Sequence, residues 1–300
     1  MKKKTYLIAL MAMALTLGSC SDNENGIGGE TSKYITVSTS IGNMTRVATD
    51  ANGGQTFEEG DEISVYAWTG APTVAPETSE RVVNNAINKL TNGTWVSTPQ
   101  MLWKNNREKH YFIGVYPTAA ISDLSAGEYT FDVNKQTESD LLVAVNPDGL
   151  SYSADAQQTV PLTFTHVMAK LAVNLTYKNQ WGGIPTVEKV VVGNAAKEAT
   201  INYLTKVVTP STTAKEDFSL PEITENTKYV SVIIPQEDVK QLTIVIGGKN
   251  FVYDNGTPFK LESGKITTVN LEVGRDEIKL GDVKITNWED GSTFSGEALN

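Results

Sequence analysis

Residues 34–41, YITVSTSI, carry the pattern that recurs along the chain and decides its fold class. Every second residue is aliphatic or β-branched: Ile35, Val37, Thr39 and Ile41. Because successive side chains of a β-strand point to opposite faces, alternation with a period of two is typical of a half-buried strand. We therefore predict a first strand here, with these four side chains facing a core.

The same alternation returns at intervals, and turn residues separate its occurrences. The alternating stretches are 63–67, 111–115, 142–144, 171–175, 230–234, 242–246 and 269–273. Gly- and Asn-containing turn signals lie at 52–54, 92–93, 147–149, 182–183, 247–248 and 255–256. Short strands between such turns predict an all-β protein built from antiparallel β-sandwiches. Residues 81–90 fit a short helix or another strand, and the pattern leaves both open.

A polar segment divides the chain into two predicted domains. The 300 residues are enough for two domains, and SYSADAQQT at 151–159 lies between two β-rich blocks. We place an N-terminal sandwich at 34–157 and a C-terminal sandwich at 158–300. The second is expected to open on the core residues Phe164, Val167, Leu171 and Val173.

The first 33 residues have the features of export and tethering signals rather than of a folded domain. Lys2 to Lys4 precede the apolar run 6–17, which has the length of a signal peptide and is too short to span a bilayer. The run leads into LGSC at 17–20, a match to a lipobox, and Cys20 is the single cysteine. We predict a signal peptide at 1–19, lipidation of Cys20, which anchors the chain in a membrane, and a polar tether at 20–33.

Charge and motif content exclude several classes of function. The formal net charge is −10 with no basic stripe, so nucleic acid is not an expected partner. Phosphate-loop, dinucleotide, zinc-protease and GxSxG signatures are absent from the sequence. His166 is expected to be a hydrogen-bonded structural residue. We predict no catalytic residue, no metal and no cofactor, and a hydrolase has the least support.

Six segments resemble the fimbrillin superfamily, the Mfa-like and major-fimbrillin group of type V pilins. They are LGSC (17–20), TRVATDANGGQTFEEGDEISVYAW (45–68), WKNNREKHYFIGVYP (103–117), DLLVA (140–144), LTFTHVMAKLAVNL (162–175) and ITNWEDG (285–291). The resemblance implies two transthyretin-like β-sandwich domains and a lipoprotein of the outer membrane and cell surface that joins other pilin subunits in a fimbrium. It also implies an Arg-specific protease, and the matching bond here is Arg46–Val47.

A mechanism of assembly follows from two segments at opposite ends of the chain. Cutting at Arg46 would separate the strand at 34–41 from the body and uncover an apolar groove with unpaired backbone groups, which a strand of another subunit can fill. The candidate donor strand is the C-terminal tail, with Ile278, Leu280, Val283, Ile285 and Trp288. Alternatively, the tail completes the second domain of its own chain, or it does both in turn, before and after assembly.

A second function stays open beside the pilus subunit, which we expect to be a polymerising or accessory one. The chain could be a monomeric surface lipoprotein that binds glycans through exposed aromatics. The candidate platform is Trp95, Trp181 and Trp288, although each of them also fits a core position at the end of a strand.

Overall fold

The computed structural model describes residues 33–42, 56–153, 158–254 and 256–288. Within these ranges the chain forms four β-sheets and two short 3-10 turns, η1 (Thr78–Glu80) and η2 (Asn179–Trp181). The prediction of an all-β sandwich protein is confirmed. In the described residues, no helix is long and apolar enough to cross a membrane.

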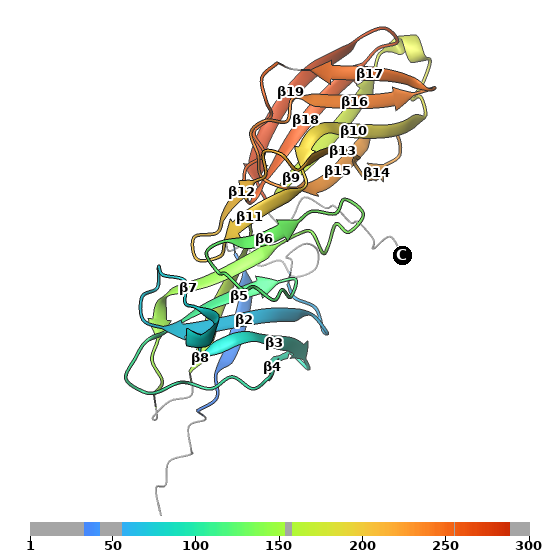
Figure 1. The fold of residues 1–300 in the computed structure, drawn as a ribbon. Helices are drawn as coiled ribbons and strands as arrows, with labels where there is room; N and C mark the ends of the chain where they lie inside the picture. The colour runs from blue at the N-terminus through green and yellow to red at the C-terminus, as the bar shows by residue number, and fades with distance from the viewer. Residues whose placement is uncertain (1–32, 43–55, 154–157, 255, 289–300) are drawn as a thin grey trace, which may run out of the picture. The chain divides into compact units, whose positions relative to one another are not determined.

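The first sheet has seven strands in the order β1-β8-β7-β5-β2-β3-β4 (Figure 1). They are β1 (Thr36–Ile41), β2 (Glu62–Thr69), β3 (Val83–Thr91), β4 (Thr94–Thr98), β5 (His110–Tyr116), β7 (Leu142–Leu150) and β8 (Thr159–His166). Every neighbouring pair is antiparallel except β1 and β8, which run parallel. The stretch 81–90, which the sequence left open, is mostly strand β3.

The two outer strands of this sheet approach each other, so that one of its faces encloses a core. The indole nitrogen of Trp95 on β4 donates a hydrogen bond to Thr39 Oγ1 on β1 at 3.0 Å. Buried side chains from all seven strands form one apolar cluster. We call it the inner core, and its members include Val37, Val83, Leu162 and Phe164.

The remaining strands form three smaller sheets. A five-stranded sheet has the order β14 (Glu222–Thr224), β15 (Lys228–Ile233), β9 (Ala169–Tyr177), β18 (Lys265–Val273), β19 (Ile278–Asn287). A four-stranded sheet has the order β13 (Lys215–Ser219), β10 (Val187–Ala196), β16 (Gln241–Ile246), β17 (Lys249–Asp254). A three-stranded sheet joins β12 (Val207–Pro210), β11 (Glu198–Asn202) and β6 (Gly127–Thr130). Their buried residues share a second core with the other face of the first sheet.

Sheet pairing crosses the polar segment at 151–159. Strand β8 begins at the last residue of this segment, yet it pairs with β7 and β1 of the first sheet. Strand β6, which precedes the segment, pairs with β11. Phe164, expected to open the second core, therefore belongs to the inner core, whereas Leu171 and Val173 belong to the second. The division into domains at 34–157 and 158–300 stays a prediction.

A glutamine side chain replaces a missing strand at one sheet edge. Beyond its short pairing with β14, strand β15 receives the amide of Gln136: Gln136 Oε1 accepts from the backbone N–H of Val232 at 2.7 Å, and Nε2 donates to Ser231 Oγ at 3.0 Å. Nε2 also lies 2.8 Å from Val133 O, which fixes the amide in place. Gln136 thus satisfies a backbone donor that a neighbouring strand would otherwise bind.

Candidate functional site

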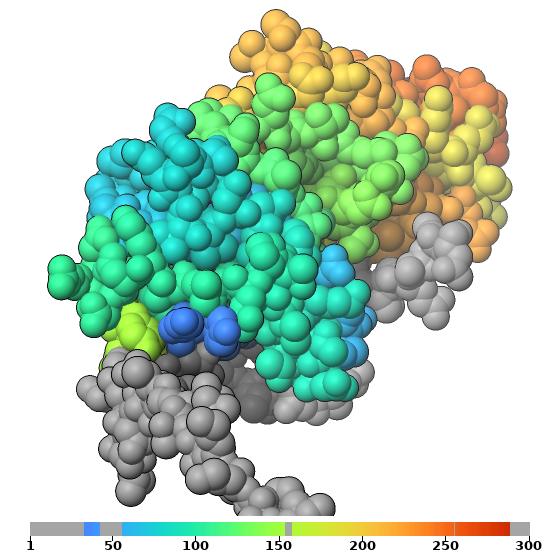
Figure 2. Space-filling model, turned by 60° about the horizontal axis from the view of Figure 1, so that its bottom comes forward, coloured from blue at the N-terminus to red at the C-terminus, as the bar shows by residue number. Residues whose placement is uncertain are grey.

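Strand β1 fills one side of the inner core. Its backbone pairs with β8 from Thr36, opposite Thr159, to Ile41, opposite Phe164. Ile35, Val37 and Ile41 are 2%, 6% and 8% exposed. In the view of Figure 2, residues 33–42 (blue) show only in small areas between segments drawn in green. The alternating side chains that define the predicted first strand therefore face inward, with Thr39 bonded to Trp95.

The beginning of β1 is also held on its other side, by residues 101–103. Ile35 N donates to Met101 O at 2.9 Å, and Trp103 N donates to Lys33 O at 3.2 Å. This short antiparallel contact places the start of β1 between two backbone segments. Pattern reading missed it, because residues 101–103 show no alternation long enough to identify a strand.

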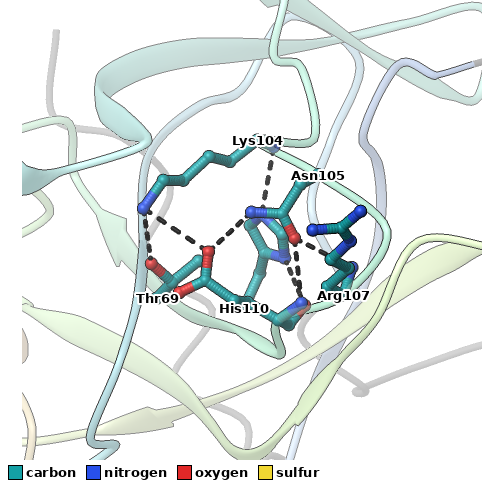
Figure 3. Close-up of polar contacts among 6 residues, drawn as sticks. Thr69, Lys104, Asn105, Arg107 and His110 are labelled. Carbon is teal, nitrogen blue, oxygen red and sulfur yellow. Dashed lines mark hydrogen bonds and ion pairs between the residues drawn. The ribbon is translucent and has the colours of Figure 1, made fainter.

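The loop after Trp103 is fixed by hydrogen bonds around a buried histidine (Figure 3). His110 Nε2 accepts from the backbone N–H of Lys104 at 3.0 Å, while Nδ1 lies 3.2 Å from Glu108 O. This pattern requires a neutral ring that carries its proton on Nδ1. Burial lowers the pKa of His110, which favours the same neutral form. Because both ring nitrogens have structural partners, His110 acts as a support of the loop.

Asn105 closes the turn within this loop. Its side-chain oxygen accepts from the backbone N–H groups of Arg107 at 2.8 Å and Glu108 at 2.9 Å. Lys104 Nζ donates to Thr69 Oγ1 at 3.1 Å, which ties the loop to the end of β2. The loop thereby holds Trp103, whose backbone contacts Lys33 beside β1.

The C-terminal candidate strand is β19, at one edge of the five-stranded sheet. Ile278, Leu280, Val283 and Ile285 lie opposite Val273, Leu271, Val269 and Thr267 of β18. These β18 side chains are 0–1% exposed, so the row on β19 lies on the inward face of the sheet. Leu280, Val283 and Ile285 are nevertheless 36%, 38% and 39% exposed. We call these three residues the β19 row: an inward-facing apolar row that is only partly covered.

A bulge at Gly281 keeps this row on one face. The spacing from Leu280 to Val283 is three, so a regular strand would turn the two side chains to opposite faces. In the structure Leu271 lies opposite Leu280 and Asn270 opposite Asp282, which leaves Gly281 as the additional residue. The pattern of the tail predicted a strand but not this bulge. The odd spacing, with a glycine inside it, is the signal that could have revealed it.

Trp288, which follows β19, is buried at 4% exposure. Its indole stacks on the imidazole of His166, with ring centroids 4.0 Å apart and planes 7° apart. His166 Nδ1 lies 2.8 Å from Asp140 Oδ1, and Lys170 Nζ lies 4.1 Å from the Trp288 ring centroid. The expectation that His166 is a hydrogen-bonded structural residue is confirmed.

The three tryptophans of the candidate glycan platform do not form one exposed surface, and that expectation is corrected. Trp95 is 9% exposed and packs in the inner core. Trp181 packs against the second core, and its indole donates to Val273 O at 3.0 Å. Trp288 is stacked on His166. Burying a large aromatic side chain is more favourable than leaving it in water, so these tryptophans pack in or against the cores.

Cys20, Arg46 and Val47 lie outside the described residues, and their predicted roles stay predictions. Among the residues that the structure describes, no group of three or more His, Cys, Asp and Glu side chains is arranged to hold a metal ion.

The chain is similar to a known family and to several solved structures. A family model described as fimbrillin-like matches residues 45–288. A putative cell adhesion protein from Bacteroides ovatus has 18% identity, a TM-score of 0.62, and coverage of 85% of this chain and 98% of that one. One from Bacteroides uniformis has 18% identity and a TM-score of 0.59, with 86% and 100% covered. A fimbrial protein from Bacteroides vulgatus has 13% identity and a TM-score of 0.52, with 84% and 99% covered. No curated protein sequence matches.

Proposed function

The chain belongs to the fimbrillin-like family, and from this premise we propose that it is a structural or accessory subunit of a cell-surface fimbrium. Family membership makes it a structural protein rather than an enzyme. We propose further that it is exported as a lipoprotein on Cys20 and assembles by exchange of strands between subunits. The similar structures named as cell adhesion or fimbrial proteins agree with a role in adhesion.

The packing of strand β1 against β8 and the inner core is the observation that carries this proposal. Strand β1 lies at the edge of the first sheet, and its Val37 and Ile41, with Ile35 just before it, belong to the inner core. Burying these three aliphatic side chains contributes roughly 5–9 kcal/mol before ordering costs. Its removal would uncover apolar surface together with the unpaired edge of β8, and such an edge recruits a strand of another chain.

Strand β19 has the properties of a donor. It ends its sheet, it pairs with only one neighbouring strand among the described residues, and the β19 row keeps more than a third of its surface exposed. A strand that buries its apolar side chains incompletely gives up less free energy when it leaves. Moving the β19 row into a closed core would complete that burial.

Cleavage at Arg46 would act as the switch. While β1 remains attached, its effective concentration at its own groove is about millimolar, so a diffusing strand that binds no better cannot displace it. Cutting the connection removes this advantage. An exchange from the tail of one subunit to the groove of the next does not close on itself, so it produces a fibre.

Replacing Arg46 by Ala tests the proposal. The Arg46→Ala variant should remain a folded monomer with an acylated, blocked Cys20, whereas polymerised wild-type protein should begin at Val47. Size-exclusion chromatography and N-terminal sequencing of the cell-surface form measure both properties. Polymers of the variant that still contain residues 34–41 would contradict the switch. Arg107→Ala, in an exposed loop of the same protein, is the matched control and should polymerise normally.

A further inference from the structure

One strand, β8, contacts both of the segments that the proposed exchange would move. Its residues from Thr159 to Phe164 pair with β1. Its last residue, His166, stacks on Trp288 just after β19. Only two positions separate His166 from Phe164, whose carbonyl accepts the backbone N–H of Gly42 at 2.7 Å. A change in the β1 contact therefore reaches the Trp288 contact through a very short length of strand.

Trp288 holds the end of β19 through contacts of its ring and of its backbone. We call Trp288, His166, Asp140 and Lys170 the Trp288 clasp. The carboxylate of Asp140 fixes the His166 ring at 2.8 Å, and the nearly parallel stacking then fixes the indole. A lysine 4.1 Å from the centroid of an indole adds a cation–π attraction.

The backbone at the clasp is equally constrained. Trp288 N donates to Gly264 O at 2.9 Å, and Gly264 N donates to Met168 O at 2.8 Å. Gly264 has φ +67°, and a Cβ there would lie 3.1 Å from His166 O. The end of β19 is thus tied to the segment that leads from β8 into β9.

Beside the backbone pairing of β19 with β18, Trp288 is the most deeply buried side-chain attachment at this end of the chain. The three residues of the β19 row are 36–39% exposed, whereas Trp288 is 4% exposed. A fully buried aromatic side chain loses more free energy on exposure than a partly covered aliphatic one. The opening of β19 is therefore governed by Trp288 more than by the β19 row.

We propose that the Trp288 clasp couples the release of β19 to the departure of β1, with β8 as the connection. When β1 leaves, β8 loses the hydrogen-bond ladder on one side up to Phe164, and the adjacent His166 is held only by β7 and Asp140, so that its ring shifts. The indole then loses its stacking partner and β19 opens. The proposal rests on the proposed function, because it assumes that both strands move during assembly, and it makes a subunit a ready donor only after it has become an acceptor.

Hydrogen exchange of the β19 amides in the Arg46→Ala protein tests this coupling in a chain expected to remain monomeric. Val37→Ala loosens β1, and Val83→Ala is the matched control, because Val83 is buried in the same inner core on β3, which does not pair with β8. Val37→Ala should accelerate exchange in β19 several-fold, whereas Val83→Ala should leave it close to the starting rate. Trp288→Ala should accelerate it by about tenfold or more, and Trp288→Phe by less, because a ring remains to stack.

The double variant decides whether the effect passes through the clasp. In Trp288→Ala protein, adding Val37→Ala should not accelerate β19 exchange further. The coupling is wrong if Val37→Ala speeds exchange in β1 alone, or if Val83→Ala has the same effect on β19. These rates are read in monomers, so coupling without polymerisation of the wild type would contradict only the proposed function. Polymerisation without coupling would contradict only the clasp.

Discussion

At the scale of residues, Gly114 on β5 shows how tightly the inner core is packed under β8. A Cβ at this position would lie 2.6 Å from Phe164 Cζ and 3.1 Å from Leu162 Cδ1. Gly114→Ala should therefore destabilise the protein by roughly 1–3 kcal/mol, because the ring must move within a filled core. Denaturant unfolding measures the change. In a Phe164→Leu background the same substitution should cost less, and equal costs in both backgrounds would show that the ring is not the obstacle.

His110 gives the loop beside β1 a dependence on pH. Burial lowers its pKa in the folded state, so the unfolded chain binds the proton more readily. The stabilisation that the neutral His110 ring contributes is fully present above the pKa of histidine in the unfolded chain, about 6.5. It is lost as pH falls through the lower pKa of His110 in the folded state. Protonation of Nε2 also removes the acceptor for Lys104 N.

The variant His110→Gln tests this dependence, because its side chain does not titrate in this range. Between about pH 7 and about pH 5 the free energy of unfolding of the wild type should fall more than that of the variant. Unfolding curves at several pH values measure both. Parallel pH profiles would show that another group titrates.

At the scale of elements, Gly281 is expected to be dispensable for packing β19. Deleting it removes the bulge and restores even spacing between Leu280 and Val283, so the β19 row stays on one face. We expect a stability within about 1 kcal/mol of the wild type. Inserting one glycine after Val283 is the opposite control, since it turns Ile285 outward. Thermal unfolding compares the two, and equal losses would contradict the account of the bulge.

Alternation in the sequence predicted strands but not their partners. Ile35 to Ile41 and Val269 to Val273 stand out locally, because burial of one face imposes a period of two on the side chains themselves. Nothing local shows that β1 runs parallel to β8, which lies more than 100 residues away, or that residues 101–103 hold its start. Pairing depends on the backbone of distant segments, and that information is not carried by the spacing of either one.

The candidate site was predictable to a similar extent. The sequence indicated that Ile278 to Ile285 alternate as a strand does, and that His166 makes a structural hydrogen bond. It did not indicate that His166 stacks on Trp288, since the two residues meet only when β8 and β19 are both in place. The sequence left open whether Trp95 is exposed or buried, because the exposure of an aromatic residue depends on which elements cover it.

At the scale of the whole molecule, Gln136 would limit the ways in which subunits of the proposed fimbrium can join. Its amide occupies the backbone N–H of Val232, at the edge of the five-stranded sheet opposite β19. Gln136→Ala should leave the fold intact and expose this edge, so that monomers associate more readily. Light scattering of the Arg46→Ala protein, with and without the added substitution, measures the difference. Gln136→Glu keeps the acceptor for Val232 N and is the control; equal scattering of all three would contradict the role of Gln136.

The occupied edge at β15 also bears on the geometry of the proposed polymer. A subunit with several open sheet edges can bind neighbours at its sides and form irregular aggregates. A subunit with one acceptor groove and one donor strand joins its neighbours end to end. With β15 occupied, exchange between β19 of one subunit and the β1 groove of the next would extend the proposed polymer end to end.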